Sequence, residues 1–160
     1  MALLSIFHVN VNCRNFDTSL AFYQSLGFTI ELPFPEDGSP LVAEGLGVGE
    51  HRVKGALLKL GDGPLAARLD LLEWLSPQTE TPQHSLTDPG IVRIAFASSS
   101  FEEDVRRLRE NGVKFISDII YRTTPEGPRP MFVCFYDPDG NVLELVNGEQ
   151  RPGAAKPATS

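Results

Sequence analysis

Apolar and polar residues alternate near the start of the chain, and the same alternation returns 85 positions later. Val9 and Val11 share one face of the first stretch, and Ile94 and Phe96 share one face of the second. A period of two is typical of a β-strand with one buried face. After each stretch, apolar residues recur every three to four positions before a glycine, which predicts a short amphipathic helix. The helical apolar positions are Phe16, Leu20 and Tyr23 in the first copy and Phe101, Val105 and Leu108 in the second.

Three further extended segments follow each predicted helix. They are 28–32, 54–60 and 68–74 in the first copy, and 113–116, 131–136 and 141–146 in the second. The turn 137–141 (Asp-Pro-Asp-Gly-Asn) predicts a hairpin, because Pro presets φ while Gly and Asn accept positive φ. Each copy therefore has the order β-α-β-β-β, and the chain predicts an α+β fold of two such modules.

The repeat sets the expected domain boundaries. The first module covers 1–78 and the second 90–147, with a linker over 79–89. Residues 148–160 are rich in Pro, Gly, Ala and Ser without an apolar period, so we expect a disordered tail.

The first module is longer than the second. From His8 to Asp70 there are 62 steps, whereas from Arg93 to Glu144 there are 51. We place the insertion at about 33–52, a stretch rich in Gly, Pro and acidic residues that predicts a loop. Such a loop can be a mobile lid over a cleft or a tolerated surface insertion, because long loops cost little entropy.

Strand parity places four polar side chains on equivalent faces of the two copies. The helices need an apolar face to pack on, and the opposite face then carries the polar residues. If the two sheets curl toward each other, these side chains meet in one apolar-walled cleft with the helices outside. The four residues are His8, Asp70, Arg93 and Glu144.

Several motifs together resemble one known superfamily. They are 7–11 (Phe-His-Val-Asn-Val) leading into 21–28, then 92–96 (Val-Arg-Ile-Ala-Phe), and finally 137–145, which is the most specific. Over about residues 5–147 the sequence resembles the vicinal oxygen chelate superfamily, the group of glyoxalases, bleomycin-resistance proteins and extradiol dioxygenases. The resemblance implies paired βαβββ modules, a curled mixed sheet around a central cleft, and a homodimer.

The resemblance also implies a divalent metal held by a His on the first strand and an acid or Gln on the last strand of each module. His8, Asp70 and Glu144 match three of these positions, whereas Arg93 falls where the third ligand belongs. Arginine has no lone pair to offer and stays protonated, so the four-ligand set is broken. Three outcomes stay open: Arg93 replaces the metal electrostatically, the other three residues still hold Mn, Fe, Ni or Zn, or the cleft only binds. We favour the first, with no cofactor.

The predicted function is an enzyme that performs acid–base chemistry on a carbonyl-containing metabolite. Glu144 or His8 would be the general base, Arg93 would hold the developing oxyanion, and Asp70 would complete the site. Isomerase, epimerase, cyclase or lyase reactions fit this chemistry. The alternatives are a drug- or metabolite-binding protein without catalysis and a metal-dependent lyase or dioxygenase. Further ligand-binding candidates are Asn10, Arg52, Trp74, Arg129 and Tyr136.

Composition excludes several other classes of protein. The net charge of −7 opposes binding to a phosphate backbone, so we expect no nucleic acid partner. No apolar run approaches the ~20 residues that span a bilayer, so we expect no membrane partner. The first residues lack a basic segment of the signal-peptide type, which predicts a cytoplasmic protein. Cys13 and Cys134 are too few for a disulfide framework.

Overall fold

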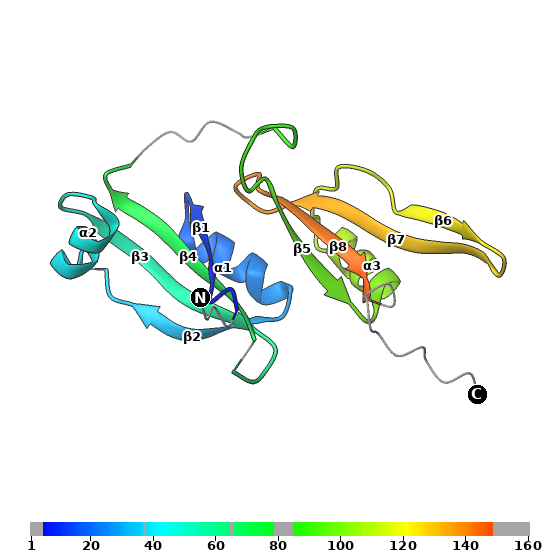
Figure 1. Cartoon of the computed structure of the whole chain (residues 1–160), viewed down its shortest axis with the longest axis horizontal. Helices are drawn as coiled ribbons and strands as arrows, with labels where there is room; N and C mark the ends of the chain where they lie inside the picture. The colour runs from blue at the N-terminus through cyan, green and yellow to red at the C-terminus, as the bar shows by residue number, and fades with distance from the viewer. Residues whose placement is uncertain (1–4, 37, 65, 79–84, 149–160) are drawn as a thin grey trace. The chain divides into compact units, whose positions relative to one another are not determined.

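The structure is a computed structural model that describes residues 5–36, 38–64, 66–78 and 85–148. The chain divides into two compact units, residues 1–81 and 82–160, and Figure 1 shows the elements of each. Most of the predicted linker (79–84) and most of the predicted disordered tail (149–160) lie outside the described residues.

The first unit contains one four-stranded mixed sheet. The strand order is β1-β4-β3-β2, in which β1 runs parallel to β4 and the other neighbours are antiparallel. Its elements are β1 (Val9–Cys13), α1 (Phe16–Ser25), β2 (Phe28–Phe34), α2 (Pro40–Leu46), β3 (Arg52–Leu60) and β4 (Ala67–Ser76).

The second unit repeats this topology with the strand order β5-β8-β7-β6. Its elements are β5 (Arg93–Ser98), α3 (Phe101–Glu110), β6 (Ile120–Thr124), β7 (Gly127–Tyr136) and β8 (Val142–Asn147). Both ends of α3 lie 85 positions after the corresponding ends of α1, as the repeat in the sequence predicts. The predicted α+β class and the two βαβββ modules are confirmed.

Each sheet buries the face that packs on its long helix. In the first unit Leu69 and Leu71 of β4 are at most 3% exposed, and Tyr23 of α1 is fully buried. In the second unit Leu143 and Val105 are similarly buried. This burial supplies the hydrophobic stabilisation of each unit. The opposite face of each sheet, which we call the open face, carries the polar residues singled out by parity.

The insertion at 33–52 is more ordered than the predicted loop. Strand β2 extends to Phe34, and the insertion contains helix α2. Ser39 caps α2 with its Oγ accepting from the Val42 N–H at 3.5 Å, Pro40 lies at the first helical position, and Gly47 ends the helix with φ +68°. The prediction of a plain loop was wrong, because the Gly and Pro content of this segment marks helix ends.

The segment 113–116 does not form the predicted strand. It contacts the end of β7 through the Ile116 N–H to Cys134 and the Tyr136 N–H to Lys114, with one isolated bridge at Phe115. The strand itself is β6, a few residues later. The apolar alternation indicates extended chain, but it does not show where pairing continues.

The hairpin between β7 and β8 is confirmed. The carboxylate of Asp137 accepts hydrogen bonds from the main-chain N–H groups of Asp139 (2.9 Å) and Asn141 (2.8 Å), while Gly140 adopts φ +89°. This closed turn fixes the register in which Glu144 lies beside Cys134. None of the helices in the described ranges is long and apolar enough to cross a membrane.

Candidate active site

His8 and Asp70 lie together in the first unit. His8 immediately precedes β1, and Asp70 sits in the middle of β4. The parallel register aligns Asn10 with Asp70, so the side chain of His8 reaches the same carboxylate. The His8 Nε2 atom is 3.9 Å from Asp70 Oδ2, with 39% of the histidine side chain and 18% of the aspartate side chain exposed. The structure therefore brings together the pair that parity predicts in the first unit.

Asn10 fixes the orientation of the Asp70 carboxylate. Its Nδ2 atom donates to the main-chain oxygen of Asp70 at 3.1 Å and to Oδ2 at 3.4 Å. The other carboxylate oxygen, Oδ1, is buried and has no hydrogen-bond partner among the described residues. Burial raises the pKa of the Asp70 carboxyl above its ordinary value, and the hydrogen bond from Asn10 and the charge that His8 carries when protonated oppose that rise. Asp70 is therefore a desolvated carboxyl with one oxygen still free to accept a proton.

Trp74 lies further along the open face of β4. Its indole Nε1 donates to Asn12 Oδ1 at 3.0 Å, and its ring lies 5.6 Å from the ring of His51 at 44°. His51 is only 9% exposed. Neither Asn12 nor His51 is among the site residues predicted from the sequence. Both residues could have been chosen as candidates from the sequence, because each lies at or beside the end of a strand on the polar face of the sheet.

Arg93 and Glu144 form the corresponding pair in the second unit. The Arg93 Nε atom is 2.7 Å from Glu144 Oε2, with 46% of the arginine side chain and 12% of the glutamate side chain exposed. Cys134, paired with Glu144 in the sheet, is close to both. Burial raises the pKa of the Cys134 thiol, the Glu144 carboxylate raises it further, and Arg93 opposes the rise. The raised pKa keeps the Cys134 thiol protonated, so it does not offer a thiolate nucleophile beside the ion pair.

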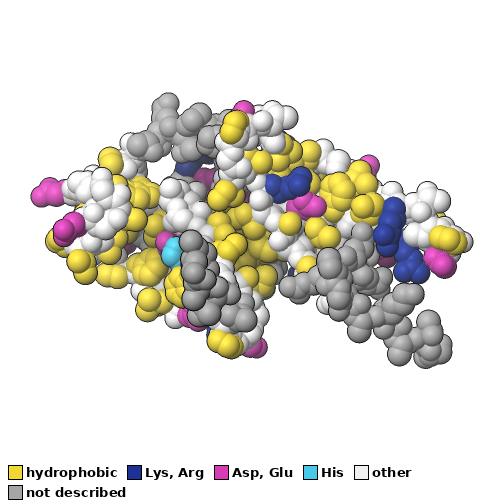
Figure 2. Space-filling model, in the orientation of Figure 1, with side chains coloured by type: hydrophobic (Ala, Val, Ile, Leu, Met, Phe, Trp, Pro, Cys, Tyr) yellow, Lys and Arg dark blue, Asp and Glu magenta, His cyan; other side chains and the backbone are white. Residues whose placement is uncertain are grey.

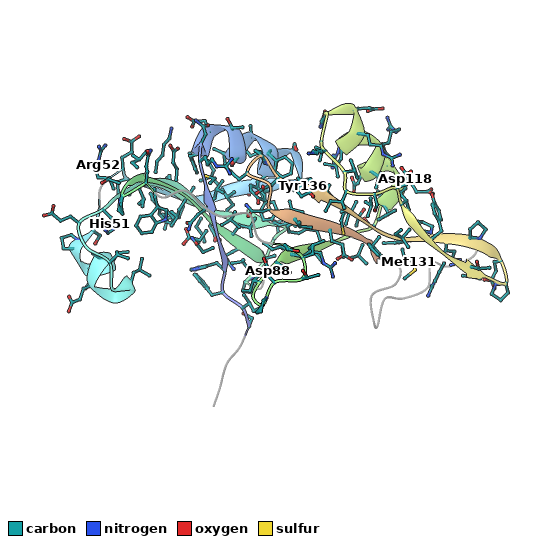
Figure 3. The ribbon with its side chains drawn as sticks, turned by 90° about the horizontal axis from the view of Figure 1, so that it is seen from above. His51, Arg52, Asp88, Asp118, Met131 and Tyr136 are labelled. Atoms are coloured by element: carbon teal, nitrogen blue, oxygen red, sulfur yellow. The ribbon has the colours of Figure 1, made fainter. Side chains whose placement is uncertain are left out.

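The other candidates occupy different environments. Tyr136 pairs with Val142, the neighbour of Arg93, and its ring lies 5.5 Å from Lys114 Nζ. Arg52 is largely exposed and 3.8 Å from Glu36. Figure 3 shows Arg52 and His51 on opposite sides of the β3–β4 ribbon.

Arg129 lies on the hairpin of β6 and β7. It is directly opposite Arg122 in the antiparallel register, and its nearest carboxylate is that of Glu126 at 4.0 Å. The roles of these ligand candidates stay predictions.

The donor residues do not fit the metal shell that the resemblance implies. Glu144 already holds the Arg93 guanidinium, and a cation there would meet a fixed positive charge. In the first unit, His8 and Asp70 supply an imidazole and a carboxylate, two of the donors that the resemblance implies. We therefore assign no step of the chemistry to a metal.

Comparison with known proteins gives one family match and one curated relative. A sequence model of the Glyoxalase/Bleomycin resistance protein/Dioxygenase superfamily matches residues 5–145. A protein of Arabidopsis thaliana named Glyoxylase I 4 is 28% identical over 156 residues, covering 94% of this chain and 74% of the relative.

Solved structures show the same fold. A glyoxalase family protein from Bacillus cereus aligns with a TM-score of 0.75 at 20% identity, covering 92% of this chain and 95% of that one. A glyoxalase family protein from Enterococcus faecalis gives 0.62 at 25% identity, covering 89% and 97%. The trypanothione-dependent glyoxalase I of Leishmania major gives 0.64 at 17% identity, covering 92% and 88%.

Proposed function

The chain belongs to the Glyoxalase/Bleomycin resistance protein/Dioxygenase superfamily, and from this premise we propose that it is an enzyme that transfers a proton within a small carbonyl compound. The observation that carries the proposal is the His8–Asp70 pair, in which an imidazole stands beside a desolvated carboxylate with one free oxygen. Isomerase and epimerase reactions of carbonyl compounds can begin with such a transfer, as can cyclase and lyase reactions that pass through an enolate.

His8 is the general base in this proposal. Its imidazole takes the proton from the carbon next to the carbonyl, which leaves an enolate and an imidazolium. The Asp70 carboxylate stabilises the imidazolium, and the hydrogen bonds from Asn10 hold that carboxylate in place. The imidazolium then returns the proton to a different atom. The 3.9 Å distance between His8 Nε2 and Asp70 Oδ2 suits an unliganded site, because catalytic contacts shorten when substrate binds.

Glu144 is the weaker candidate for the base. Its carboxylate is already paired with Arg93 at 2.7 Å, and it would have to leave that pair in order to accept a proton. Arg93 uses Nε for Glu144, and its half-exposed guanidinium carries further N–H donors that suit an enolate oxygen. We assign to Arg93 the oxyanion-binding role, with Glu144 as its positioning residue.

Solvent deuterium exchange tests this function without knowledge of the natural substrate. We expect the protein to accelerate exchange of the α-protons of glycolaldehyde or hydroxyacetone in D2O, followed by NMR. His8→Ala should slow the exchange by roughly 10²- to 10⁴-fold, and Arg93→Ala by roughly 10²- to 10³-fold. Arg106→Ala is the matched control, because Arg106 is an exposed arginine of α3 paired with Glu103 and Glu110.

Two results would contradict the proposal. The first is an exchange rate in the His8→Ala protein equal to that of the unmodified chain. The second is saturable binding of these compounds with no exchange above the buffer rate, which would indicate the binding-protein alternative.

We also propose that the acting form is a homodimer in the cytoplasm. Large apolar side chains are exposed just before the edge strands of both sheets: Phe7 is 65% exposed before β1, and Ile91 is 86% exposed before β5. Exposed apolar residues at sheet edges favour association with another chain.

A further inference from the structure

Trp74, Asn12 and His51 form a cluster on the open face of the first sheet, which we call the Trp74 cluster. The inference drawn from it rests on the proposed function, because the cluster occupies the same face as His8 and Asp70. Asn12 and Leu72 are aligned in the parallel register of β1 and β4, two residues beyond the aligned pair of Asn10 and Asp70. The cluster therefore continues the row of residues that begins at the proposed catalytic pair.

The indole of Trp74 determines how the Asn12 amide is turned. An indole N–H can only donate, so the Asn12 atom 3.0 Å from Nε1 must be the carbonyl oxygen. The Nδ2 group of Asn12 then points away from the indole with two N–H donors. No described residue accepts a hydrogen bond from Nδ2. This leaves a donor held in place beside an aromatic ring.

The backbone around His51 determines which ring nitrogen carries its proton. The Nδ1 atom is 3.2 Å from the main-chain oxygen of Gly49, and a carbonyl can only accept. Neutral His51 is therefore protonated at Nδ1, and its Nε2 carries a lone pair. The ring is held by its packing on Trp74 and by the close approach of Gly38 to the His51 carbonyl, where a Cβ atom on Gly38 would lie 1.8 Å from the oxygen.

The insertion supplies this part of the site. Figure 3 shows His51 on the same side of the β3–β4 ribbon as α2. Figure 2 shows hydrophobic side chains over α2 and β2, and the exposed ones include Leu32 and Leu41. The Trp74 cluster itself offers one hydrogen-bond donor, Asn12 Nδ2, and one acceptor, His51 Nε2.

The spacing along β4 sets the length of the ligand. Asp70 and Trp74 lie on the same face four residues apart, which is about 13 Å along a strand. Leu72 lies between them on that face. A ligand with its carbonyl at Asp70 would therefore place an apolar spacer over Leu72 and its far end at Trp74.

We propose that the Trp74 cluster binds a phenol-type ring at the end of the substrate distant from the reacting carbonyl. The ring packs on the indole, while ring hydroxyl oxygens accept from Asn12 Nδ2 and their protons are donated to His51 Nε2. No charged side chain contacts the cluster through a hydrogen bond or an ion pair among the described residues, which suits a neutral ring. The chemical class of the substrate is thus a hydroxyaromatic compound linked to a carbonyl group.

Phenol is the probe, and Trp74 is the reporter, because the chain contains one tryptophan. Excitation at the red edge of the indole band avoids phenol absorption, and N-acetyltryptophanamide corrects for collisional quenching. We expect a saturable change of fluorescence with a dissociation constant in the millimolar range, usual for a fragment of this size. Cyclohexanol, which has the hydroxyl group without the flat ring, should bind at least several-fold more weakly.

Two variants test the polar groups. Asn12→Leu removes the donor, and His51→Phe keeps an aromatic ring against Trp74 while removing the acceptor. Each should weaken phenol binding roughly three- to tenfold, the effect of one lost hydrogen bond. Near-ultraviolet circular dichroism of Trp74 checks that the indole stays packed.

His8→Ala separates this inference from the proposed function. That variant should bind phenol like the unmodified chain even though α-proton exchange is lost. Failure of the unmodified chain to exchange α-protons, with intact phenol binding, would count against the catalytic proposal alone. Absence of saturable phenol binding, equal binding of cyclohexanol, or unchanged affinity in both cluster variants would overturn the assignment of the Trp74 cluster.

Discussion

Asp70 carries a free-energy cost in the folded protein that the other described carboxylates do not carry. Its buried Oδ1 has no hydrogen-bond partner among the described residues, and burial raises the pKa of its carboxyl. A carboxyl whose pKa is raised by folding destabilises the folded state when ionised. Carboxyl groups with perturbed pKa values cluster at functional sites, which agrees with the proposed role of Asp70 beside His8.

The stability of an Asp70→Asn variant should show this cost. Near pH 7 the variant should have a larger free energy of unfolding than the unmodified chain, because it has no carboxylate to desolvate. As pH falls through the raised pKa of Asp70, protonation relieves the cost in the unmodified chain and the difference should shrink. Urea unfolding at several pH values between neutral and acidic measures this difference in the free energy of unfolding. A difference that grows toward acidic pH would contradict the assignment.

The candidate residues were predictable because a strand alternates its faces. His8 with Asp70, and Arg93 with Glu144, are paired as strand parity indicates, since the parallel register leaves little choice of neighbour. The bond from Trp74 to Asn12 was not predictable, because parity gives the face of a residue but not its rotamer. The meeting of all four polar residues in one site stays a prediction from the sequence.

At the scale of elements, the position of α2 depends on the packing of one glycine. Gly38 lies against the backbone of His51, so the segment before α2 and the start of β3 are held together. Gly45 lies inside α2, and a Cβ there would meet nothing within 4 Å. Gly38 and Gly45 therefore have opposite requirements.

Substitution of these glycines tests whether the insertion holds His51 against Trp74. Gly38→Ala should move His51 away and change the fluorescence of Trp74. Gly45→Ala should leave the fluorescence unchanged and strengthen α2 by up to about 1 kcal/mol. Steady-state emission spectra of the two variants are sufficient. Identical Trp74 spectra in Gly38→Ala and the unmodified chain would show that His51 does not depend on this contact.

Elements with a sustained period were predicted well, and short or interrupted ones were not. Helices α1 and α3 combine an apolar stripe with acidic first turns, so several signals agreed. Helix α2 has no buried residue, and its only sequence signals were its caps. Segment 113–116 has the alternation of a strand, but the neighbour available at that point of β7 offers only two main-chain hydrogen bonds.

For the whole molecule, the proposed homodimer predicts a measurable mass. Sedimentation equilibrium at micromolar concentration should give twice the chain mass of 17.5 kDa. Phe7→Asp combined with Ile91→Asp should shift the equilibrium toward the monomer, because both side chains are exposed and apolar beside edge strands. A measured mass of one chain at all concentrations would rule out the dimer.

In the proposed function the Arg93 guanidinium takes the place of a metal ion, and His8 moves the proton while Asp70 stabilises the imidazolium. The most direct measurement is α-proton exchange by the tag-free protein after removal of metals with a chelator, with elemental analysis of the same sample. We expect the chelated protein to keep its exchange rate, and we expect addition of Mn, Fe, Ni or Zn to change that rate little. Exchange lost on chelation and restored by one of these metals, at about one ion per chain, would contradict it.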